Sequence, residues 1–218
     1  MGESTYRNGE SFDLVWRPYG ERGVLIECRD LNEVHALFRA VRGSDLVEEC
    51  VPGAQTLYVE PRNPVTSSAE LVRLIASLPR NSTSSFGDAE RPLHVVDVVY
   101  DGVDLNDIAA LTCLSVEEVI RRHTAPTYTV AFLGFSRAFP YLVGLDPALV
   151  VPRLVSPRPS VPAGSIAMGA GFTGIYPAST PGGWRLLGRS RVAFFDESRD
   201  PPGLLAPGDR VRFQAAPA

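Results

Sequence analysis

Arginine provides all of the basic side chains other than histidine. The 218-residue chain has 21 Lys+Arg residues, and every one of them is arginine. The absence of lysine excludes a Walker-type phosphate-binding lysine, a Schiff base and a lysine nucleophile. A planar guanidinium suits two-point binding of carboxylate or phosphate. Arg153, Arg158 and Arg185, which stand beside Gly- and Pro-rich segments, are therefore candidate ligand-binding cations, with structural or surface ion pairing as the alternative.

His123 is a further candidate for chemistry. It ends a predicted helix at 115–123, immediately before an apolar strand pattern. A neutral imidazole at that place can act as a base or hydrogen-bond a substrate. The helix dipole alone also favours a histidine at a helix C-terminus, so a structural role stays open. His35 and His94 have no second ligand at metal-binding spacing, and we interpret them as structural.

Residues 161–189 are rich in glycine and include the GxGxxG spacing of dinucleotide sites at 169–174. Such a site requires a helix after its last glycine, which Pro177 and Pro181 prevent. The glycines therefore predict turns and close backbone approaches between strands. A glycine-rich backbone can still bind an anion through its amides, and nearby hydroxyls can assist. This predicts three contacts with substrate or nucleotide: Gly171, Thr173 and Tyr176.

Charge and composition argue against several classes of protein. A net charge of −4 and a pI near 5.4 give no basic field that would attract nucleic acid. No apolar run approaches the roughly 20 residues that span a bilayer, and the polar start is unlike a signal peptide, so we expect a cytoplasmic protein. Cys28, Cys50 and Cys113 are predicted to be buried reduced thiols, and no metal site is expected.

Hydrophobic patterning divides the chain into two parts. The first part has the order strand, strand, helix, strand, strand, helix, which is typical of a small antiparallel sheet with helices on one face. Residues 81–91 are polar and aperiodic, as in a linker. We therefore predict an α+β chain with an N-terminal domain at 1–80 and a second domain at 92–218. The elements predicted in the first part are strands at 12–17, 23–27, 46–51 and 55–60, and helices at 31–41 and 67–78.

The second part changes character along its length. A strand is predicted at 93–100, followed by helices at 105–111 and 115–123. Beyond Thr127, short apolar runs are broken by Pro and Gly as far as a final strand that ends at Phe213. Many short strands with frequent turns indicate a closed or sandwiched β structure.

An ordered set of motifs in this second part resembles the allophanate hydrolase subunit 1 family, which includes the B-type chain of bacterial 5-oxoprolinase and the sporulation kinase inhibitor KipI. The resemblance covers most of the chain. The motifs that carry it are YTVAFLGF at 128–135, FPYL at 139–142, VPAGS at 161–165, TGIYP at 173–177, PGGWRL at 181–186 and PGDRVRF at 207–213.

The resemblance implies a small N-terminal α/β sandwich domain followed by a cyclophilin-like β-barrel. It also implies a partner of the allophanate hydrolase subunit 2 kind, which is the C-type chain of 5-oxoprolinase, and a third, A-type component. With ATP and magnesium, the 5-oxoprolinase members open 5-oxoproline to glutamate. The alternatives are a carboxyltransferase or allophanate hydrolase component of urea metabolism, and a KipI-like inhibitor of a sensor histidine kinase.

Lactam hydrolysis with ATP needs cations for the developing phosphate charge and a group that positions water or substrate. We predict His123 and Arg185 as catalytic, and Arg153 and Arg158 as contacts of substrate or nucleotide. Three positions depart from the family pattern, because Phe172, Ala138 and Val143 stand where glutamine, glycine and glycine are usual. Phe172 cannot orient a polar substrate as an amide would.

Overall fold

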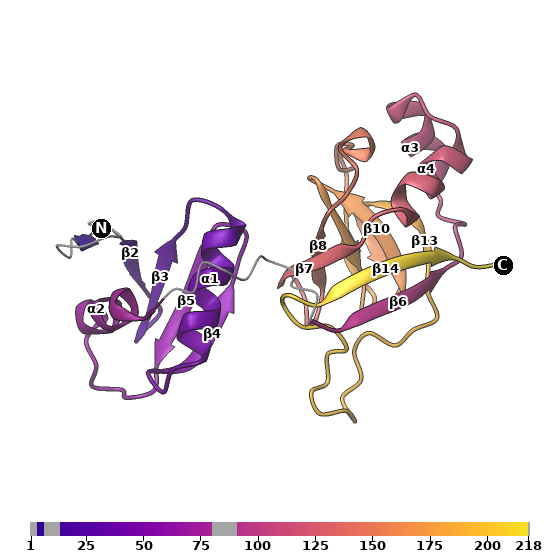
Figure 1. Ribbon diagram of the computed structural model, residues 1–218. Helices are drawn as coiled ribbons and strands as arrows, with labels where there is room; N and C mark the ends of the chain where they lie inside the picture. Colours follow the sequence, from indigo (N-terminus) through magenta and orange to yellow (C-terminus); the bar gives the residue numbers. More distant parts are fainter. Residues whose placement is uncertain (1–3, 7–13, 80–90, 218) are drawn as a thin grey trace. The chain divides into compact units, whose positions relative to one another are not determined.

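The computed structural model describes residues 4–6, 14–79 and 91–217 (Figure 1). The backbone divides into two compact units, Met1–Asp88 and Ala89–Ala218. The predicted linker at 81–91 lies outside the described residues, apart from Arg91. Each unit has its own hydrophobic core.

The first unit is an antiparallel sheet with helices, as the sequence predicts. Its five strands lie in the order β1-β2-β3-β5-β4, and alternate strand residues share one core with residues of both helices. The sequence patterns did not predict β1. The elements are β1 (Ser4–Tyr6), β2 (Leu14–Tyr19), β3 (Gly23–Glu27), α1 (Leu31–Arg42), β4 (Val47–Pro52), β5 (Thr56–Pro61) and α2 (Ser68–Ser77).

Side-chain caps begin both helices of this unit. The Asp30 carboxylate accepts a hydrogen bond from the Glu33 backbone N–H at 2.9 Å, and the Ser67 hydroxyl accepts one from the Glu70 N–H at 3.3 Å. Each cap satisfies an amide that has no partner within its helix. The N-terminus predicted from the Ser67–Glu70 spacing is therefore confirmed. Gly43 caps the other end of α1.

The second unit is a barrel of seven strands in the order β13-β10-β11-β8-β7-β14-β6. Val99, just after β6, and Arg189 of β13 exchange two backbone hydrogen bonds of 2.9 Å, which join the first and last strands. The predicted α+β class with a closed β structure is confirmed. The barrel strands are β6 (Leu93–Val98), β7 (Tyr128–Leu133), β8 (Pro140–Val143), β10 (Ser165–Gly169), β11 (Phe172–Ile175), β13 (Arg185–Arg189) and β14 (Arg210–Ala215).

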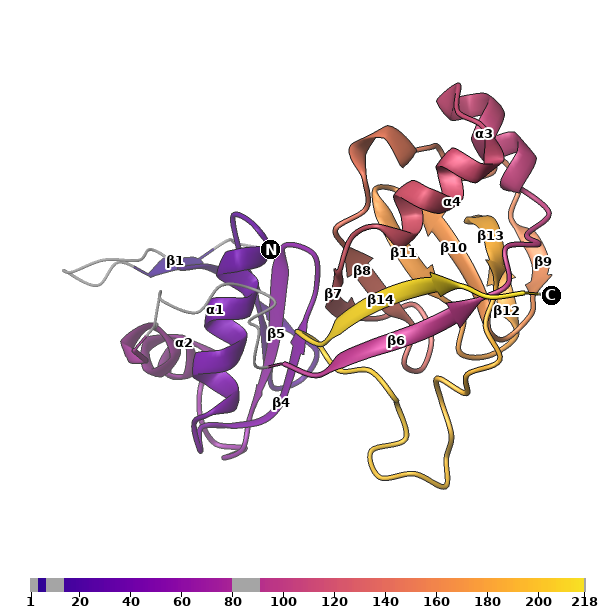
Figure 2. The same cartoon turned by 45° about the vertical axis from the view of Figure 1, so that its right-hand side comes forward.

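Two helices lie together beside one end of the barrel (Figures 1 and 2). They are α3 (Leu105–Thr112) and α4 (Val116–Thr124), and α4 begins at Ser115, whose hydroxyl accepts from the Glu118 N–H. A short 3₁₀ helix, η1, covers Pro147–Leu149. Strands β9 (Arg158–Val161) and β12 (Thr180–Gly182) form a separate antiparallel ribbon.

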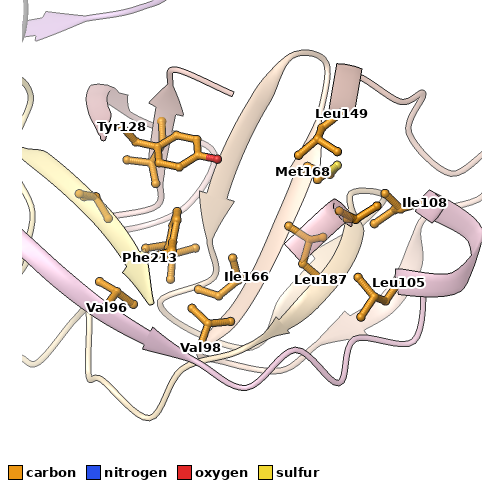
Figure 3. Close-up of a cluster of buried hydrophobic side chains, with 14 of the residues drawn as sticks. Val96, Val98, Leu105, Ile108, Tyr128, Leu149, Ile166, Met168, Leu187 and Phe213 are labelled. Atoms are coloured by element: carbon orange, nitrogen blue, oxygen red, sulfur yellow. The ribbon is translucent and has the colours of Figure 1, made fainter. Parts of the chain in front are cut away.

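The barrel sheet has an apolar cluster on each face. The interior cluster is shown in Figure 3, where side chains of β6, β10, β13, β14 and α3 point toward one another. Ala167 of β10 and Leu186 of β13 alternate with interior neighbours, so they face outward. The residues of this outer cluster are Phe139, Val161, Ala167, Tyr176, Trp184 and Leu186.

The GxGxxG segment is a β-hairpin. Gly169 of β10 pairs with Phe172 of β11, and the two residues between them, Ala170 and Gly171, have φ of 53° and 81°. Positive φ at both central positions is the pattern of a type I′ turn. A side chain at Gly169 would meet the Trp184 ring at 2.9 Å. The predicted turns and close backbone approaches are confirmed, since no helix follows the segment.

The prediction for the cysteines is only partly correct. Cys28 is buried, and burial raises the pKa of the partly buried Cys50 thiol to about 12. Cys113 is exposed, because it stands at the C-cap of α3 with φ of 55°. The prediction of burial is therefore wrong for Cys113. Within the described residues, the helices are too short or too polar to cross a membrane.

Candidate functional site

The predicted site residues lie on both faces of the barrel sheet. Along β11, Thr173 faces the interior, where its neighbour on β8, Leu142, belongs to the interior cluster. Tyr176, just beyond β11, belongs to the outer cluster. His123 joins Thr173 inside the barrel, whereas Trp184 gathers the arginines on the outer face. The residues therefore form two separate groups.

In the interior group, His123 is fully buried and both of its ring nitrogens have partners. Nδ1 lies 2.7 Å from the Tyr100 hydroxyl, and Nε2 lies 3.3 Å from the Thr173 hydroxyl. The ring stacks on Phe213 with centroids 4.7 Å apart, and the Tyr128 hydroxyl donates to the His123 carbonyl. The imidazole therefore has no face open to solvent in this conformation.

Burial fixes the charge state of this group. It lowers the pKa of His123 to about 3 and raises the pKa of Tyr100 and Tyr128 above the ordinary tyrosine value. The imidazole is therefore neutral at neutral pH, and one ring nitrogen donates while the other accepts. A substrate can reach the ring only after Tyr100 or Thr173 moves, so the catalytic role of His123 stays a prediction.

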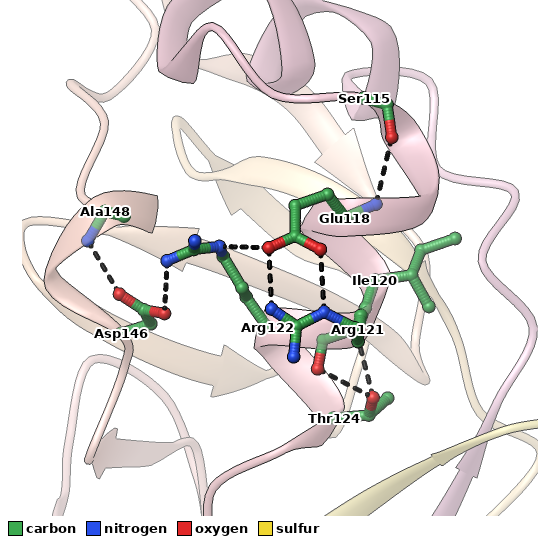
Figure 4. A network of polar contacts seen from close by, with 8 residues as sticks. All are labelled: Ser115, Glu118, Ile120, Arg121, Arg122, Thr124, Asp146 and Ala148. Carbon is green, nitrogen blue, oxygen red and sulfur yellow. Dashed lines mark hydrogen bonds and ion pairs between the residues drawn. The ribbon is translucent and has the colours of Figure 1, made fainter.

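Helix α4 is held in place by an ion-pair network near His123 (Figure 4). The Glu118 carboxylate accepts from Arg121 at 2.6 and 2.7 Å and from Arg122 at 2.7 Å. Arg122 also donates to Asp146, just before η1, at 3.0 Å. Hydrogen bonds from the two arginines lower the pKa of Glu118 to about 2. The network ties the helix that carries His123 to the η1 segment.

In the outer group, acidic residues near the start of α3 bind two of the three candidate arginines. Asp104 is buried and accepts from Arg158 at 2.6 Å and from the Leu186 backbone N–H at 2.7 Å. Asp107 lies 3.6 Å from Arg185, whose side chain is 13% exposed. Arg158 and Arg185 therefore have structural partners, and their predicted ligand-binding and catalytic roles are untested.

Arg153 is placed differently from the other two arginines. It is exposed, and its guanidinium carbon lies 5.5 Å from the centroid of the Trp184 ring. A cation in this position is attracted to the electron-rich face of the indole. No carboxylate in the described part of the chain lies within ion-pair distance of Arg153. Arg153 therefore presents an uncompensated positive charge.

Tyrosines complete the outer group. Tyr176 is buried, and burial raises its pKa against a hydrogen bond from the Trp184 backbone N–H. Tyr141 is partly exposed, and its ring meets that of Trp184 edge to face at 5.4 Å. Gly171 lies apart from these residues, in the β10–β11 turn. The structure thus brings together Arg153, Arg158, Arg185 and Tyr176, but not Gly171, Thr173 or His123.

Sequence reasoning missed the two carboxylates that hold the arginines. Asp104 and Asp107 look in sequence like ordinary acidic residues at a helix start, which the helix dipole favours. The partner of Asp104 is 54 residues away along the chain, so no local spacing indicates the pairing.

The three departures from the family pattern also have a place. Phe172 packs edge to face on Phe132 and Tyr141, and so extends the aromatic outer face. Ala138 has φ of 57°, a conformation that glycine adopts without strain. Val143 ends β8 opposite Thr129.

Comparison with known proteins identifies the family. The family model described as carboxyltransferase domain, subdomain C and D, matches residues 14–205. A curated relative from Escherichia coli O157:H7, whose name is that of the 5-oxoprolinase B chain, is 40% identical over 170 residues, 77% of each chain. A Bacillus subtilis protein of the same name is 48% identical over 112 residues, which are 51% of this chain and 47% of the relative.

Solved structures agree with this assignment. The crystal structure of TTHA0988 is 38% identical with a TM-score of 0.78; the match covers 90% of this chain but only 40% of that one. The Kluyveromyces lactis urea carboxylase shares the fold, with a TM-score of 0.74, 18% identity, and coverage of 98% of this chain and 23% of that one. The chain therefore belongs to the carboxyltransferase subdomain C and D family, in which its relatives include B-type chains of 5-oxoprolinase.

Proposed function

We propose that this chain is the B-type component of an ATP-dependent 5-oxoprolinase, which opens the lactam of 5-oxoproline to glutamate while ATP is hydrolysed to ADP and phosphate. The observation that carries the proposal is the 40% identity to a protein named as the 5-oxoprolinase B chain, over 77% of both sequences. A name of this kind implies a complex of several chains, and the proposed partners are a C-type chain of the allophanate hydrolase subunit 2 kind and an A-type chain.

The outer group is the part of this chain that best fits the proposed chemistry. Both substrates are anions, since 5-oxoproline carries a carboxylate and ATP carries phosphates. A guanidinium at the surface binds either group through paired N–H donors. Among the described residues, no three His, Cys, Asp or Glu side chains gather as metal ligands, so the proposal assigns no magnesium ligand to this chain.

Two other functions predict different results. A carboxyltransferase component of urea metabolism would depend on a biotinylated carrier, which this chain cannot be because it has no lysine. The fold shared with urea carboxylase motivates this alternative. A KipI-like inhibitor would bind a histidine kinase without turnover. The aromatic residue at position 172, where the family usually has glutamine, favours a binding surface at this place.

The deciding experiment reconstitutes the chain with the A-type and C-type chains from the same genome. We expect ADP release that requires 5-oxoproline and forms glutamate in equal amount, and that disappears when any one chain is omitted. Urea with a biotinylated carrier serves as the competing substrate. ADP release that does not respond to 5-oxoproline, in a complex shown to assemble, would overturn the proposal.

A further inference from the structure

The three arginines around Trp184 divide into two kinds. Arg158 and Arg185 are paired with Asp104 and Asp107, whereas Arg153 has only an aromatic partner in the described residues. We infer that Arg153 is the oxyanion-binding group of this barrel, and that it holds a carboxylate or phosphate oxygen of a small ligand beside the face of Trp184. This inference rests on the proposed function, because it names the ligand chemistry of the same site.

The backbone on both sides of Arg153 is fixed to the segment that carries Trp184. The Arg185 side chain donates through Nε to the Pro152 carbonyl at 3.0 Å, and the Leu154 N–H donates to the Gly183 carbonyl at 2.8 Å. The guanidinium thus starts from a held backbone and ends on the indole ring. A cation held in place before binding loses less conformational freedom when the ligand arrives.

The paired arginines explain how this arrangement persists. Arg158 binds Asp104 through one nitrogen and approaches the Trp184 carbonyl at 3.5 Å through another. Arg185 connects Asp107 to the Pro152 carbonyl. Both therefore act as positioning residues, because their charge is matched by a carboxylate and their donors hold the segments around Arg153. The remaining positive charge of the group belongs to Arg153.

Tyrosine hydroxyls lie near this charge. Burial raises the pKa of Tyr141 and of Tyr176, and in both cases the positive charge of Arg153 acts in the opposite direction. Tyr141 is partly exposed, so its hydroxyl can donate to a ligand oxygen that Arg153 holds. A guanidinium with a neutral hydroxyl suits a small oxyanion. The two substrates of the proposed reaction provide it as the carboxylate of 5-oxoproline or the phosphate of ATP.

Tryptophan fluorescence gives a direct binding measurement on the full chain. The chain has two tryptophans, and Trp16→Phe leaves Trp184 as the reporter. The Trp16 indole N–H has no hydrogen-bond partner in the described structure, so this change removes no bond. The chain, alone and with its partner chains, is titrated separately with 5-oxoproline, ATP and inorganic phosphate. We expect a saturable change in emission with at least one of them.

Variants of Arg153 test the assignment. Arg153→Ala is expected to weaken binding at least about tenfold, and Arg153→Lys to give an intermediate affinity because it keeps the charge but loses the planar donor pair. Arg212→Ala, at an exposed arginine of β14 away from the group, is the matched control and should bind normally. Circular dichroism checks folding, and Arg153→Gln serves as a second neutral variant that keeps a long side chain.

The inference fails if none of the three ligands changes the emission, either in the chain alone or in the complex. It also fails if a folded Arg153→Ala variant binds as tightly as the parent. Its failure is distinct from that of the proposed function. Turnover of 5-oxoproline with an unchanged KM in Arg153→Ala would overturn the inference alone. Arg153-dependent binding in an assembled complex without turnover would overturn the function alone.

Discussion

On the inner face of the barrel sheet, His123 has a hydroxyl partner at each ring nitrogen and no exposed surface, whereas on the outer face Arg153 is exposed and lacks a carboxylate partner among the described residues. The physical cause of the difference is water. A buried polar group without a partner costs about 1–3 kcal/mol, so the interior must satisfy every group. An exposed cation is hydrated and can stay available for a ligand.

The comparison separates two roles that residue type alone does not distinguish. Histidine and arginine are both common in active sites, yet here the histidine stabilises the barrel interior and the arginine offers charge at the surface. Asp104 shows the intermediate case, because it is buried on the outer face and bound by both Arg158 and the Leu186 N–H. The extent to which a polar side chain is satisfied is therefore the better guide to where ligands bind.

The largest expected effect comes from removing the interior imidazole. His123→Ala should lower the free energy of unfolding by about 3–5 kcal/mol, because it leaves a cavity beside Phe213 and two hydroxyls without partners. Urea unfolding followed by Trp184 fluorescence in the Trp16→Phe background measures it. His94→Ala, at a partly exposed histidine, is the control and should cost far less. A loss below about 1 kcal/mol in His123→Ala would contradict a structural role.

Removing the carboxylate of Asp104 should have the next largest effect. Asp104→Ala leaves Arg158 and the Leu186 N–H without their acceptor, and we expect a loss of about 3 kcal/mol in the same urea assay. Asp107→Ala is the matched comparison, because Asp107 is 68% exposed and 3.6 Å from its arginine, so it should cost about 0.5 kcal/mol or less. Equal losses in the two variants would refute this ranking.

The pH dependence of stability should report His123 alone between pH 5 and 6.5. The pKa of His123 is lowered to about 3 in the folded chain, so the unfolded chain binds more protons in this range and stability falls as pH falls. The slope for one such group is about 1.4 kcal/mol per pH unit below its unfolded pKa near 6.5. The pKa of Glu118, lowered to about 2, acts only at lower pH.

The control for this pH dependence is His123→Gln, measured by urea unfolding at each pH. The difference between the parent and this variant removes the contributions of His35 and His94. The difference should shrink as pH falls from 6.5 to 5, because only the parent loses stability through this ring. A difference that does not change with pH would show that His123 is not held neutral.

The smallest expected effect is a gain of stability in the β10–β11 turn. Ala170→Asn should raise the free energy of unfolding by about 0.5–1 kcal/mol, because asparagine tolerates the positive φ of 53° and Asn-Gly is the preferred type I′ pair. Thermal unfolding measures the gain. Asparagine at Ala206, which lies outside this turn, is the comparison and should bring no gain. Binding to the Arg153 group should not change, since the turn lies apart from it.

Local patterns predicted much of the fold. The spacing of Ser67 and Glu70 and that of Ser115 and Glu118 indicated helix starts, and the structure confirms both caps. The glycine and proline pattern around Gly171 correctly predicted turns between strands. Such features could be predicted because a cap or a two-residue turn is made by residues that are neighbours in the chain. The exposure of Cys113 and the existence of β1 could not be predicted in this way.

By itself the sequence determined the α+β class, most helices and strands, and the set of chemically able residues, through periodicity, caps and the absence of lysine. Only the tertiary structure decided which of those residues meet. His123 and Thr173 are 50 residues apart, and Arg158 and Asp104 are 54 apart. Strand register places Thr173 inside the barrel and Tyr176 outside it, because successive side chains alternate between the faces of a sheet, and a shift of one residue would exchange them.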